Sequence, residues 1–317
     1  MINKNTRAFI CGIKGKSLSN NEKKFLVKYK PWGIILFSRN IDTIKQTQEL
    51  TKSIKKLFKN YNYPILIDEE GGRVSRLKKF IDNSIFTAKF FGDMSKNNPK
   101  KFSIYFNIYV KQIGHLLKIL GININTVPIL DIRRKNSHKI IGDRSYSTNK
   151  KIVKKVGEIC IKNFHKNKIG TVIKHIPGHG LAKVDSHKKL PVINKNLNYL
   201  IKNDFSTFKN NKSLLGMTGH LLFKKIDNLN ISTHSKKIID IVRNKIQFKN
   251  IIITDDLSMK AIKKDLKTNV LASFNAGCNI VLHCNGNLKE MLIVAKNSPK
   301  IDNFILKKTS QLISIIG

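Results

Sequence analysis

The chain has 317 residues, and its hydrophobic content of 41% excludes a wholly disordered protein because it is enough for a large buried core. The formal net charge of +40 could indicate a nucleic acid or an anionic surface as partner, but only eight of the 60 basic residues are Arg, and Lys is spread along the whole chain. Nucleic-acid-binding proteins favour clustered Arg between aromatic residues, so we expect no nucleic-acid partner and at most a long-range attraction of acidic substrates.

Short apolar runs alternate with longer helix-like segments from one end of the sequence to the other. Eight runs are typical of buried β-strands, namely residues 7–13, 33–37, 64–67, 122–130, 170–173, 213–218, 250–254 and 279–283. Between them, apolar residues recur every three to four positions, as in amphipathic helices, in segments such as 42–57, 102–120 and 150–165. No linker rich in Pro, Gly or Ser divides the sequence. The pattern predicts one α/β domain over residues 1–317, a single-domain (β/α)8 barrel of the TIM type.

The predicted strand ends carry the polar side chains that are capable of chemistry. They are Ser38, Arg39 and Asn40, Asp68, Glu69 and Glu70, Asp131, Lys174 and His175, His220, Asp255 and Asp256, and Cys284 and Asn285. In a parallel barrel the active site is built on the C-terminal ends of the strands. A doubly wound open sheet is the structural alternative, but it would gather its site at one switch point rather than along seven strand ends.

The third predicted strand is followed by three acids, two glycines and two arginines, in the sequence DEEGGRVSR at residues 68–76. A carboxylate at a strand end can accept hydrogen bonds from two vicinal sugar hydroxyls, which favours a substrate-binding role for Asp68. For Glu70 and Arg73 we favour a structural ion-pair network in which Arg76 also takes part.

Three histidines and an acid lie close together after the fifth predicted strand, at His175, His179, Asp185 and His187. His and Asp are ordinary zinc ligands, so a metal site is one interpretation. The proline and glycines between them prevent a helix that would place His175 and His179 on one face, and we therefore expect no metal.

The alternative interpretation of this segment is a strand end followed by a loop. Lys174 and His175 then offer hydrogen-bond donors to hydroxyl or acyl oxygens. In the loop, Asp185 can hold the imidazole of His187 in one tautomer and raise its basicity. A histidine oriented in this way is a competent acid and base near neutral pH.

The seventh predicted strand ends in two adjacent carboxylates, Asp255 and Asp256. Because side chains alternate along a strand, only one of them can point at the barrel axis, so both cannot be nucleophiles. The structural interpretation of the other is the N-cap of a helix that begins in the run 257–262.

Four cysteines, with no CxxC pair among them, indicate neither a disulfide framework nor a thiolate metal site. The sequence has no apolar run long enough for a signal peptide at residues 1–17 and no 18-residue apolar stretch elsewhere. We expect a cytoplasmic protein that does not cross a membrane.

Taken together, these segments resemble the β-N-acetylhexosaminidases of glycoside hydrolase family 3, of the NagZ type. The family's motifs DxEGGRVxR, KHFPGHG, DSHxxLP and SDDLSM correspond to residues 68–76, 174–180, 185–191 and 254–259. Similar pieces at residues 33–40, 127–132, 141–146 and 276–285 follow the family's order. The resemblance spans nearly the whole chain, with Ile176 in place of the usual aromatic residue.

The resemblance implies specific roles. Asp255 is the expected nucleophile, and Asp256 is left to the helix start. His187, supported by Asp185, is the expected general acid and then general base. The implied substrate-binding residues are Asp68, Arg76, Arg144, Lys174 and His175. The reaction would be a double displacement with retention, and it needs no cofactor or metal.

By resemblance, the substrate is N-acetylglucosamine β-1,4-linked to anhydro-N-acetylmuramic acid on muropeptides, processed by a monomer during peptidoglycan recycling. A phosphorylase or a broader β-glycosidase of the same family is the nearest alternative, because a neutral His acid/base can admit phosphate in place of water. A non-catalytic glycan or nucleic-acid binder is the third alternative, and it would need neither Asp255 nor His187.

Overall fold

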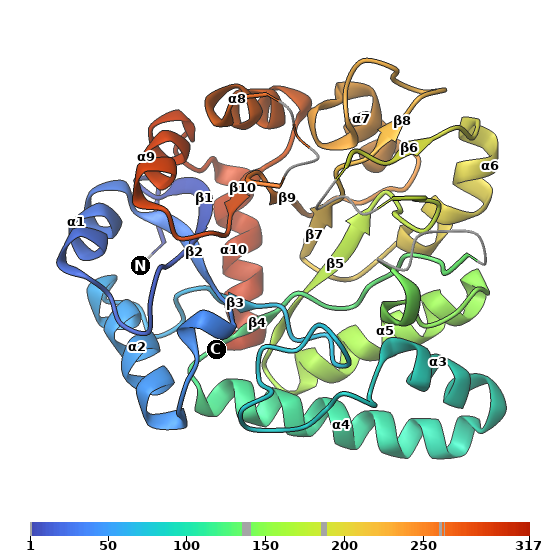
Figure 1. Ribbon diagram of the computed structural model, residues 1–317, viewed down its shortest axis with the longest axis horizontal. Coiled ribbons are helices and arrows are strands. Elements are labelled where there is room, and N and C mark those ends of the chain that lie inside the picture. The colour runs from blue at the N-terminus through green and yellow to red at the C-terminus, as the bar shows by residue number, and fades with distance from the viewer. Residues whose placement is uncertain (1, 135–140, 185–188, 260–261, 263) are drawn as a thin grey trace.

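The computed structural model of the protein describes residues 2–134, 141–184, 189–259, 262 and 264–317. In this part of the chain, eight parallel strands form a closed barrel in the spatial order β1-β10-β9-β7-β5-β4-β3-β2 (Figure 1). The strands are β1 (Arg7–Gly12), β2 (Pro31–Leu36), β3 (Ile65–Ile67), β4 (Ile124–Asn125), β5 (Gly170–Ile176), β7 (Leu215–Thr218), β9 (Ile251–Asp256) and β10 (Ile280–His283). Each lies within or overlaps one of the eight apolar runs, so the predicted (β/α)8 barrel is confirmed.

Helices pack around the barrel; most of them lie between successive strands, and α9 and α10 follow the last strand (Figure 1). They are α1 (Asn20–Tyr29), α2 (Ile44–Leu57), α3 (Ala88–Asn97), α4 (Pro99–Ile119), α5 (Lys150–Lys166), α6 (Leu197–Lys202), α7 (Lys236–Asn244), α8 (Leu266–Ala276), α9 (Leu288–Asn297) and α10 (Asn303–Ile316). Many begin at a side-chain cap; Ser19 and Glu22, for example, form a capping box at the start of α1. Within the described residues, no helix is long and apolar enough to cross a membrane.

Two parts of the structure differ from the expected elements. The run 122–130 forms only the short β4, and beyond it the carbonyls of Val127 and Pro128 still accept hydrogen bonds from the amides of Val172 and Lys174 on β5. Ile129 then makes an isolated bridge to Lys174. A small parallel pair, β6 (Val192–Ile193) with β8 (Leu222–Phe223), lies outside the barrel and was not predicted from the sequence.

Side-chain alternation along the strands produces two apolar cores. On β9, Ile251 and Ile253 point into the barrel, whereas Ile252 packs outward against the helices. The inner core contains one or two aliphatic side chains from most of the strands and is fully buried. This period of two continues past the strand ends, so it decides which polar side chains face the barrel axis.

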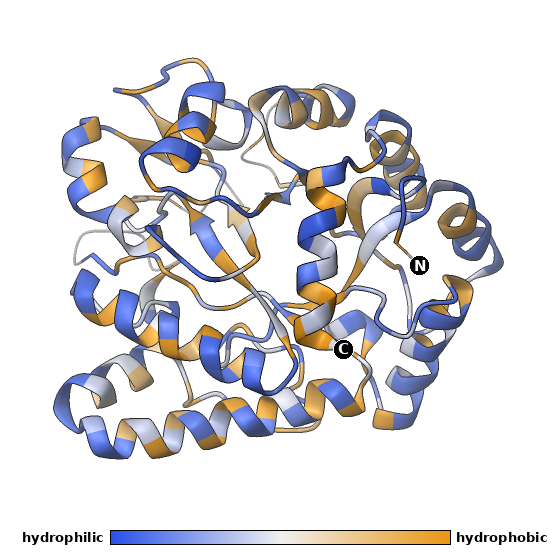
Figure 2. Ribbon diagram, turned by 180° about the vertical axis from the view of Figure 1, so that it is seen from behind, coloured by the Kyte–Doolittle hydropathy of each residue, from blue (hydrophilic) through white to orange (hydrophobic). Residues whose placement is uncertain are grey.

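The helix α10 closes the barrel at the N-terminal ends of its strands. Seen from behind, it lies across the middle of the molecule (Figure 2). Its Thr309 accepts a 2.8 Å hydrogen bond from the indole of Trp32 on β2, and its Leu312 and Ile316 lie against Gly170 on β5. The barrel is therefore closed at this end and open only at the opposite one.

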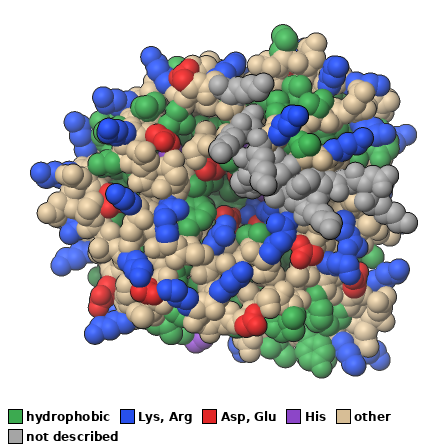
Figure 3. Space-filling model, viewed as in Figure 1, with side chains coloured by type: hydrophobic (Ala, Val, Ile, Leu, Met, Phe, Trp, Pro, Cys, Tyr) green, Lys and Arg blue, Asp and Glu red, His purple; other side chains and the backbone are tan. Residues whose placement is uncertain are grey.

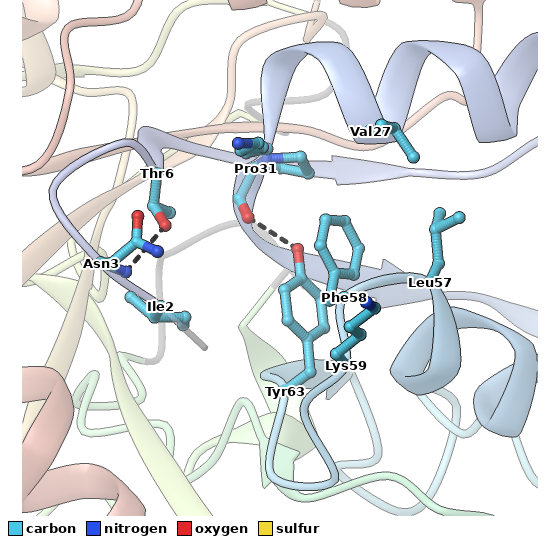
Figure 4. A pocket seen from close by; sticks show the side chains of 10 residues that line it. Ile2, Asn3, Thr6, Val27, Pro31, Leu57, Phe58, Lys59 and Tyr63 are labelled. Carbon is cyan, nitrogen blue, oxygen red and sulfur yellow. Dashed lines mark hydrogen bonds between the residues drawn. The ribbon is translucent and has the colours of Figure 1, made fainter.

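A separate cavity of about 200 Å³ lies between the N-terminal ends of β1 and β2 and the end of α2 (Figure 4). Its wall includes Tyr63, whose ring stacks on Phe58 at 4.0 Å and whose hydroxyl donates to the carbonyl of Pro31 at 2.6 Å. Tyr63 is buried and satisfied, so we interpret this cavity as a packing feature.

A test of the packing concerns Gly92 in α3. A Cβ atom there would lie 1.7 Å from the carbonyl oxygen of Tyr146, which is backbone and cannot move away easily. We expect Gly92→Ala to lower the free energy of unfolding in urea by about 2 kcal/mol, despite the better helix propensity of Ala. Gly15→Ala is the matched control, because no atom lies within 4 Å of its Cβ position. Equal stability of the two variants would contradict the packing described for α3.

Candidate active site

The open end of the barrel holds a cavity of about 310 Å³. In the space-filling view, basic and acidic side chains gather around a hollow near the middle of this face (Figure 3). The predicted nucleophile and all five predicted substrate-binding residues line it: Asp68, Arg76, Arg144, Lys174, His175 and Asp255. These residues come from positions as far apart as 68 and 255, and the barrel brings them together.

Alternation along the strands explains why these side chains face the cavity. Three of them continue the inward-facing series of their strands: Asp68 follows Leu66, Lys174 follows Val172, and Asp255 follows Ile253. At β5 the register with β7 shifts between Lys174 and Ile176. Such an irregularity redirects side chains, and it allows the neighbouring His175 to line the same cavity as Lys174.

The ammonium group of Lys174 is the centre of a buried ionic network. Its side chain is 3% exposed, and it lies 2.9 Å from Asp68, 2.9 Å from Thr126 and 2.8 Å from Glu70. Burial by itself lowers the pKa of Lys174, but Asp68 and Glu70 raise it above its ordinary value. Lys174 therefore remains charged, with an acceptor for each of its three hydrogens.

Glu70 completes this network through Arg144. The guanidinium group donates two hydrogen bonds to the carboxylate, at 2.7 and 2.8 Å. Burial raises the pKa of Glu70, but Arg144 and Lys174 together bring it down to about 2. The predicted network of Glu70 with Arg73 and Arg76 is wrong, because a bidentate, buried arginine is a better partner than an exposed one.

The two arginines of the 68–76 segment have other partners. Arg73 contacts Asp143 at 3.2 Å on the surface, and Arg76 approaches Asp68 at 3.5 Å. Burial raises the pKa of Asp68, but Lys174 and Arg76 hold it well below its usual range. Asp68 is thus an ionised carboxylate at the cavity wall.

His175 is oriented by Asp131, a residue whose role the sequence did not reveal. The Asp131 carboxylate accepts a 2.7 Å hydrogen bond from Nδ1 of His175 and a 2.6 Å bond from the backbone amide of His179. Because Nδ1 carries the hydrogen in this contact, Nε2 is the nitrogen left for a ligand. Only the position of Asp131 at a predicted strand end signalled its importance.

Asp255 and Asp256 both line the cavity, but their carboxylates differ in their surroundings. Asp256 accepts hydrogen bonds from the amide and hydroxyl of Ser258, at 3.0 and 2.7 Å, and from the amide of Cys284 at 3.1 Å. These contacts fasten Asp256 to the end of β10, whereas Asp255 continues the inward series of β9.

The predicted role of Asp256 as a helix start is wrong. The next helix, α8, begins at Leu266, and its N-cap is Asp265. Asp256 instead caps the turn at Ser258, which is a common alternative for Asp because its short side chain reaches the amide two residues on.

The remaining residues that line the cavity are apolar. They are Phe37, Val74, Met217, Met259, Leu282 and Cys284. Phe37 lies between two guanidinium groups, with Arg39 4.9 Å and Arg76 5.4 Å from its ring centroid. The cavity therefore combines charged, hydrogen-bonding groups with apolar side chains, which suits a polar ligand that carries a small apolar group.

Two predicted catalytic residues, Asp185 and His187, lie outside the described residues. So does half of the candidate zinc-ligand set. Within the described part of the chain, no group of three His, Cys, Asp or Glu side chains is placed to hold a metal ion. His175 and His179 are both present, with ring centroids 5.5 Å apart.

Comparisons with known proteins agree on one family. The model of the glycosyl hydrolase family 3 N-terminal domain matches residues 8–311. A β-hexosaminidase of Nitrosomonas eutropha is 30% identical over 282 residues, which cover 86% of this chain and 79% of that protein. A β-hexosaminidase of Hydrogenovibrio crunogenus is 29% identical over 283 residues, with coverages of 86% and 77%.

A solved structure is similar over nearly the same length. NagZ from Neisseria gonorrhoeae, in complex with N-trifluoroacetyl-D-glucosamine, has a TM-score of 0.84 and 28% identity. The similarity covers 97% of this chain and 90% of that one.

The buried histidines predict how stability depends on pH. Burial lowers the pKa of His165, His179 and His234 from 6.5 to about 4. The unfolded chain takes up these protons below pH 6.5, whereas the folded protein resists them until about pH 4. The free energy of unfolding should therefore be highest above pH 6.5 and should fall as the pH drops towards 4.

His165→Gln tests this dependence away from the cavity. Urea unfolding between pH 7.5 and 4.5 should show a shallower decline for the variant than for the wild type, because one of the three histidines is gone. Identical slopes would show that His165 does not titrate differently in the two states.

Proposed function

The chain belongs to glycosyl hydrolase family 3 and is a glycoside hydrolase of the β-N-acetylhexosaminidase class, and we propose that it removes terminal N-acetylglucosamine from β-linked sugar chains with retention of configuration. The observation that carries the proposal is the cavity that Asp255 lines together with the Asp68, Lys174 and Arg144 network. A nucleophile beside an array of hydrogen-bonding groups suits a reaction at the anomeric carbon of a bound sugar.

The nucleophile is Asp255. Its strand directs it to the cavity, and the neighbouring Asp256 is occupied by Ser258 and Cys284. In the first step, the Asp255 carboxylate attacks the anomeric carbon while the bond to the leaving oxygen breaks. His187, assisted by Asp185, gives its proton to that oxygen.

The second step restores the enzyme. Water attacks the anomeric carbon of the glycosyl-enzyme, His187 takes the proton from that water, and the bond to Asp255 breaks. A histidine base places no second negative charge beside the nucleophile. One domain over residues 1–317 holds all of these groups, so we propose that a single barrel performs both steps.

Sugar hydroxyls would bind to the charged groups that line the cavity. Asp68 is ionised and accepts hydrogen bonds, whereas Arg76, Arg144, Lys174 and Nε2 of His175 surround the same space. The network holds these groups in place before the substrate arrives, so little of the binding energy is spent on arranging them.

The apolar residues that line the cavity support an N-acetylated sugar. Met217, Met259 and Leu282 offer contacts to the acetamido methyl group that glucose lacks. A solved relative binds an N-acylated glucosamine, N-trifluoroacetyl-D-glucosamine. We therefore propose N-acetylglucosamine at the non-reducing end as the sugar that this cavity selects.

The aglycone that we propose is the anhydro-N-acetylmuramoyl peptide of a muropeptide, linked β-1,4, as in peptidoglycan recycling. Its peptide carboxylates suit a protein with a net charge of +40, whose Arg39 and Arg73 lie near the cavity. We place the reaction in the cytoplasm, and the four cysteines support this because none forms a disulfide.

The first test compares substrates. The enzyme should hydrolyse 4-nitrophenyl N-acetyl-β-glucosaminide at least about ten times faster than the matching glucoside, measured as kcat/KM, because burial of one methyl group changes binding by this factor. Asp255→Ala should lower kcat by at least about four orders of magnitude. Release of sugar 1-phosphate as the main product in phosphate buffer would contradict the hydrolase assignment and favour a phosphorylase.

A second test concerns His187. His187→Ala should slow substrates with poor leaving groups, such as a β-1,4-linked disaccharide, by about 100-fold or more, because these need protonation of the leaving oxygen. Cleavage of the activated 4-nitrophenyl glycoside should suffer less in its first step. Equal losses on both substrates in single-turnover experiments would contradict the assignment of His187 as the acid.

A further inference from the structure

His220 contacts the residue next to the nucleophile and has no place in the mechanism so far. It follows β7, two residues after Thr218, and its side chain is fully buried. β7 and β9 are neighbours in the barrel (Figure 1). His220 is close enough to Asp255 and Asp256 for both carboxylates to influence its pKa.

The hydrogen bonds of His220 define its tautomer. Nε2 lies 3.1 Å from the backbone carbonyl oxygen of Asp256, which can only accept, so Nε2 carries the hydrogen. Nδ1 is then an acceptor, and it takes the hydroxyl hydrogen of Thr233 at 2.8 Å. Thr233 in turn accepts from the hydroxyl of Thr218 at 2.9 Å. Each ring nitrogen thus has a partner, and the ring is held at both ends.

The end of β9 is fastened on the β10 side without His220. Thr254 accepts from the amide of Leu282, the amide of Leu257 donates to the carbonyl of Leu282, and Asp256 accepts from the amide of Cys284. These contacts hold residues 254–257, the segment that contains Asp255, against β10.

The β7 side is different. In the described residues, backbone pairing of β7 with β9 stops at Met217 and Ile253, two residues before Asp255. Beyond that point, the side chain of His220 connects the two strand ends through the carbonyl of Asp256. The position of the nucleophile in the cavity therefore depends on β10 contacts from one side and on this imidazole from the other.

We propose that His220 is a positioning residue for the nucleophile: it donates a hydrogen bond from Nε2 to the carbonyl of Asp256 and so fixes the end of β9 and the direction of Asp255. The assignment rests on the proposed function. The neutral ring also places no positive charge next to the attacking carboxylate. Burial lowers the pKa of His220 and His175 lowers it further, against the opposite influence of Asp255 and Asp256.

Two replacements of His220 distinguish the loss of the hydrogen bond to Asp256 from the loss of the imidazole ring itself. The amide of Gln in His220→Gln places a donor near the position of Nε2. The side chain of Asn in His220→Asn is one methylene shorter, so its amide lies near the position of Nδ1, where it can contact Thr233 but not the carbonyl of Asp256. We expect kcat on 4-nitrophenyl N-acetyl-β-glucosaminide to fall by about 100-fold in His220→Asn and by less than about ten-fold in His220→Gln, as a small misplacement of a reacting group predicts. The inhibition constant of N-acetylglucosamine should change by less than about two-fold in both, since the sugar-binding wall is intact.

The step affected is formation of the glycosyl-enzyme. The first-turnover rate of 4-nitrophenol release should fall in parallel with kcat in His220→Asn. Equal kcat values for the Asn and Gln variants would overturn the assignment, as would a loss that appears in the inhibition constant and not in kcat.

Thr233→Val provides a second route if His220→Asn does not fold. It leaves the imidazole in place but removes the hydrogen that fixes Nδ1, and we expect kcat to fall by about five-fold at an unchanged inhibition constant. A wild-type kcat in this variant would overturn the proposal. Failure of the wild-type enzyme to cleave the glycoside would instead overturn the proposed function, so the two failures are distinguishable.

Discussion

The active site depends on the burial of an ammonium group. Lys174 can occupy the barrel interior only because Asp68, Glu70 and Thr126 surround it, and Glu70 is in turn held by Arg144. Removing one partner of a buried ion pair costs about 3–5 kcal/mol where the charge that remains is left without a counterpart, and here Lys174 and Glu70 each have two partners of opposite charge. Arg76 approaches Asp68 as well, so three cations and two anions form one network, and the groups offered to a sugar are fixed before it binds.

The barrel meets this requirement through a simple regularity. Parallel strands end at the same face, and alternation continues the inner series of Leu66, Val172 and Ile253 into Asp68, Lys174 and Asp255. On each of these strands the inward-facing residue in the interior is aliphatic, and the inward-facing residue two positions later is charged and lies where water and substrate have access. The apolar core and the active site are thus successive layers of inward-facing side chains along the barrel axis.

The sequence was sufficient for the barrel and for six residues that line the cavity, Asp68, Arg76, Arg144, Lys174, His175 and Asp255, because these follow from local periodicity and from motifs. It did not predict the apolar lining residues or that Asp256 also lines the cavity. The sequence did not predict which residues pair with one another in ion pairs and hydrogen bonds. Glu70 binds Arg144, 74 positions away, and His175 binds Asp131, 44 positions away. Which arginine reaches an acid depends on the three-dimensional course of the loops, and the same holds for Asp256, whose carboxylate turns to Cys284 and Ser258 instead of starting a helix.

The helix α10, which closes the barrel, contacts a strand that lies far from it in the sequence. The hydrogen bond from Trp32 to Thr309 joins residues 277 positions apart. Loop-closure entropy opposes such a contact until the strands between them are assembled, so neither half of the barrel gains it alone. The N-terminal and C-terminal parts of the chain are consequently linked into one cooperative folding unit, in which the entry strands and the last helix lose their order together.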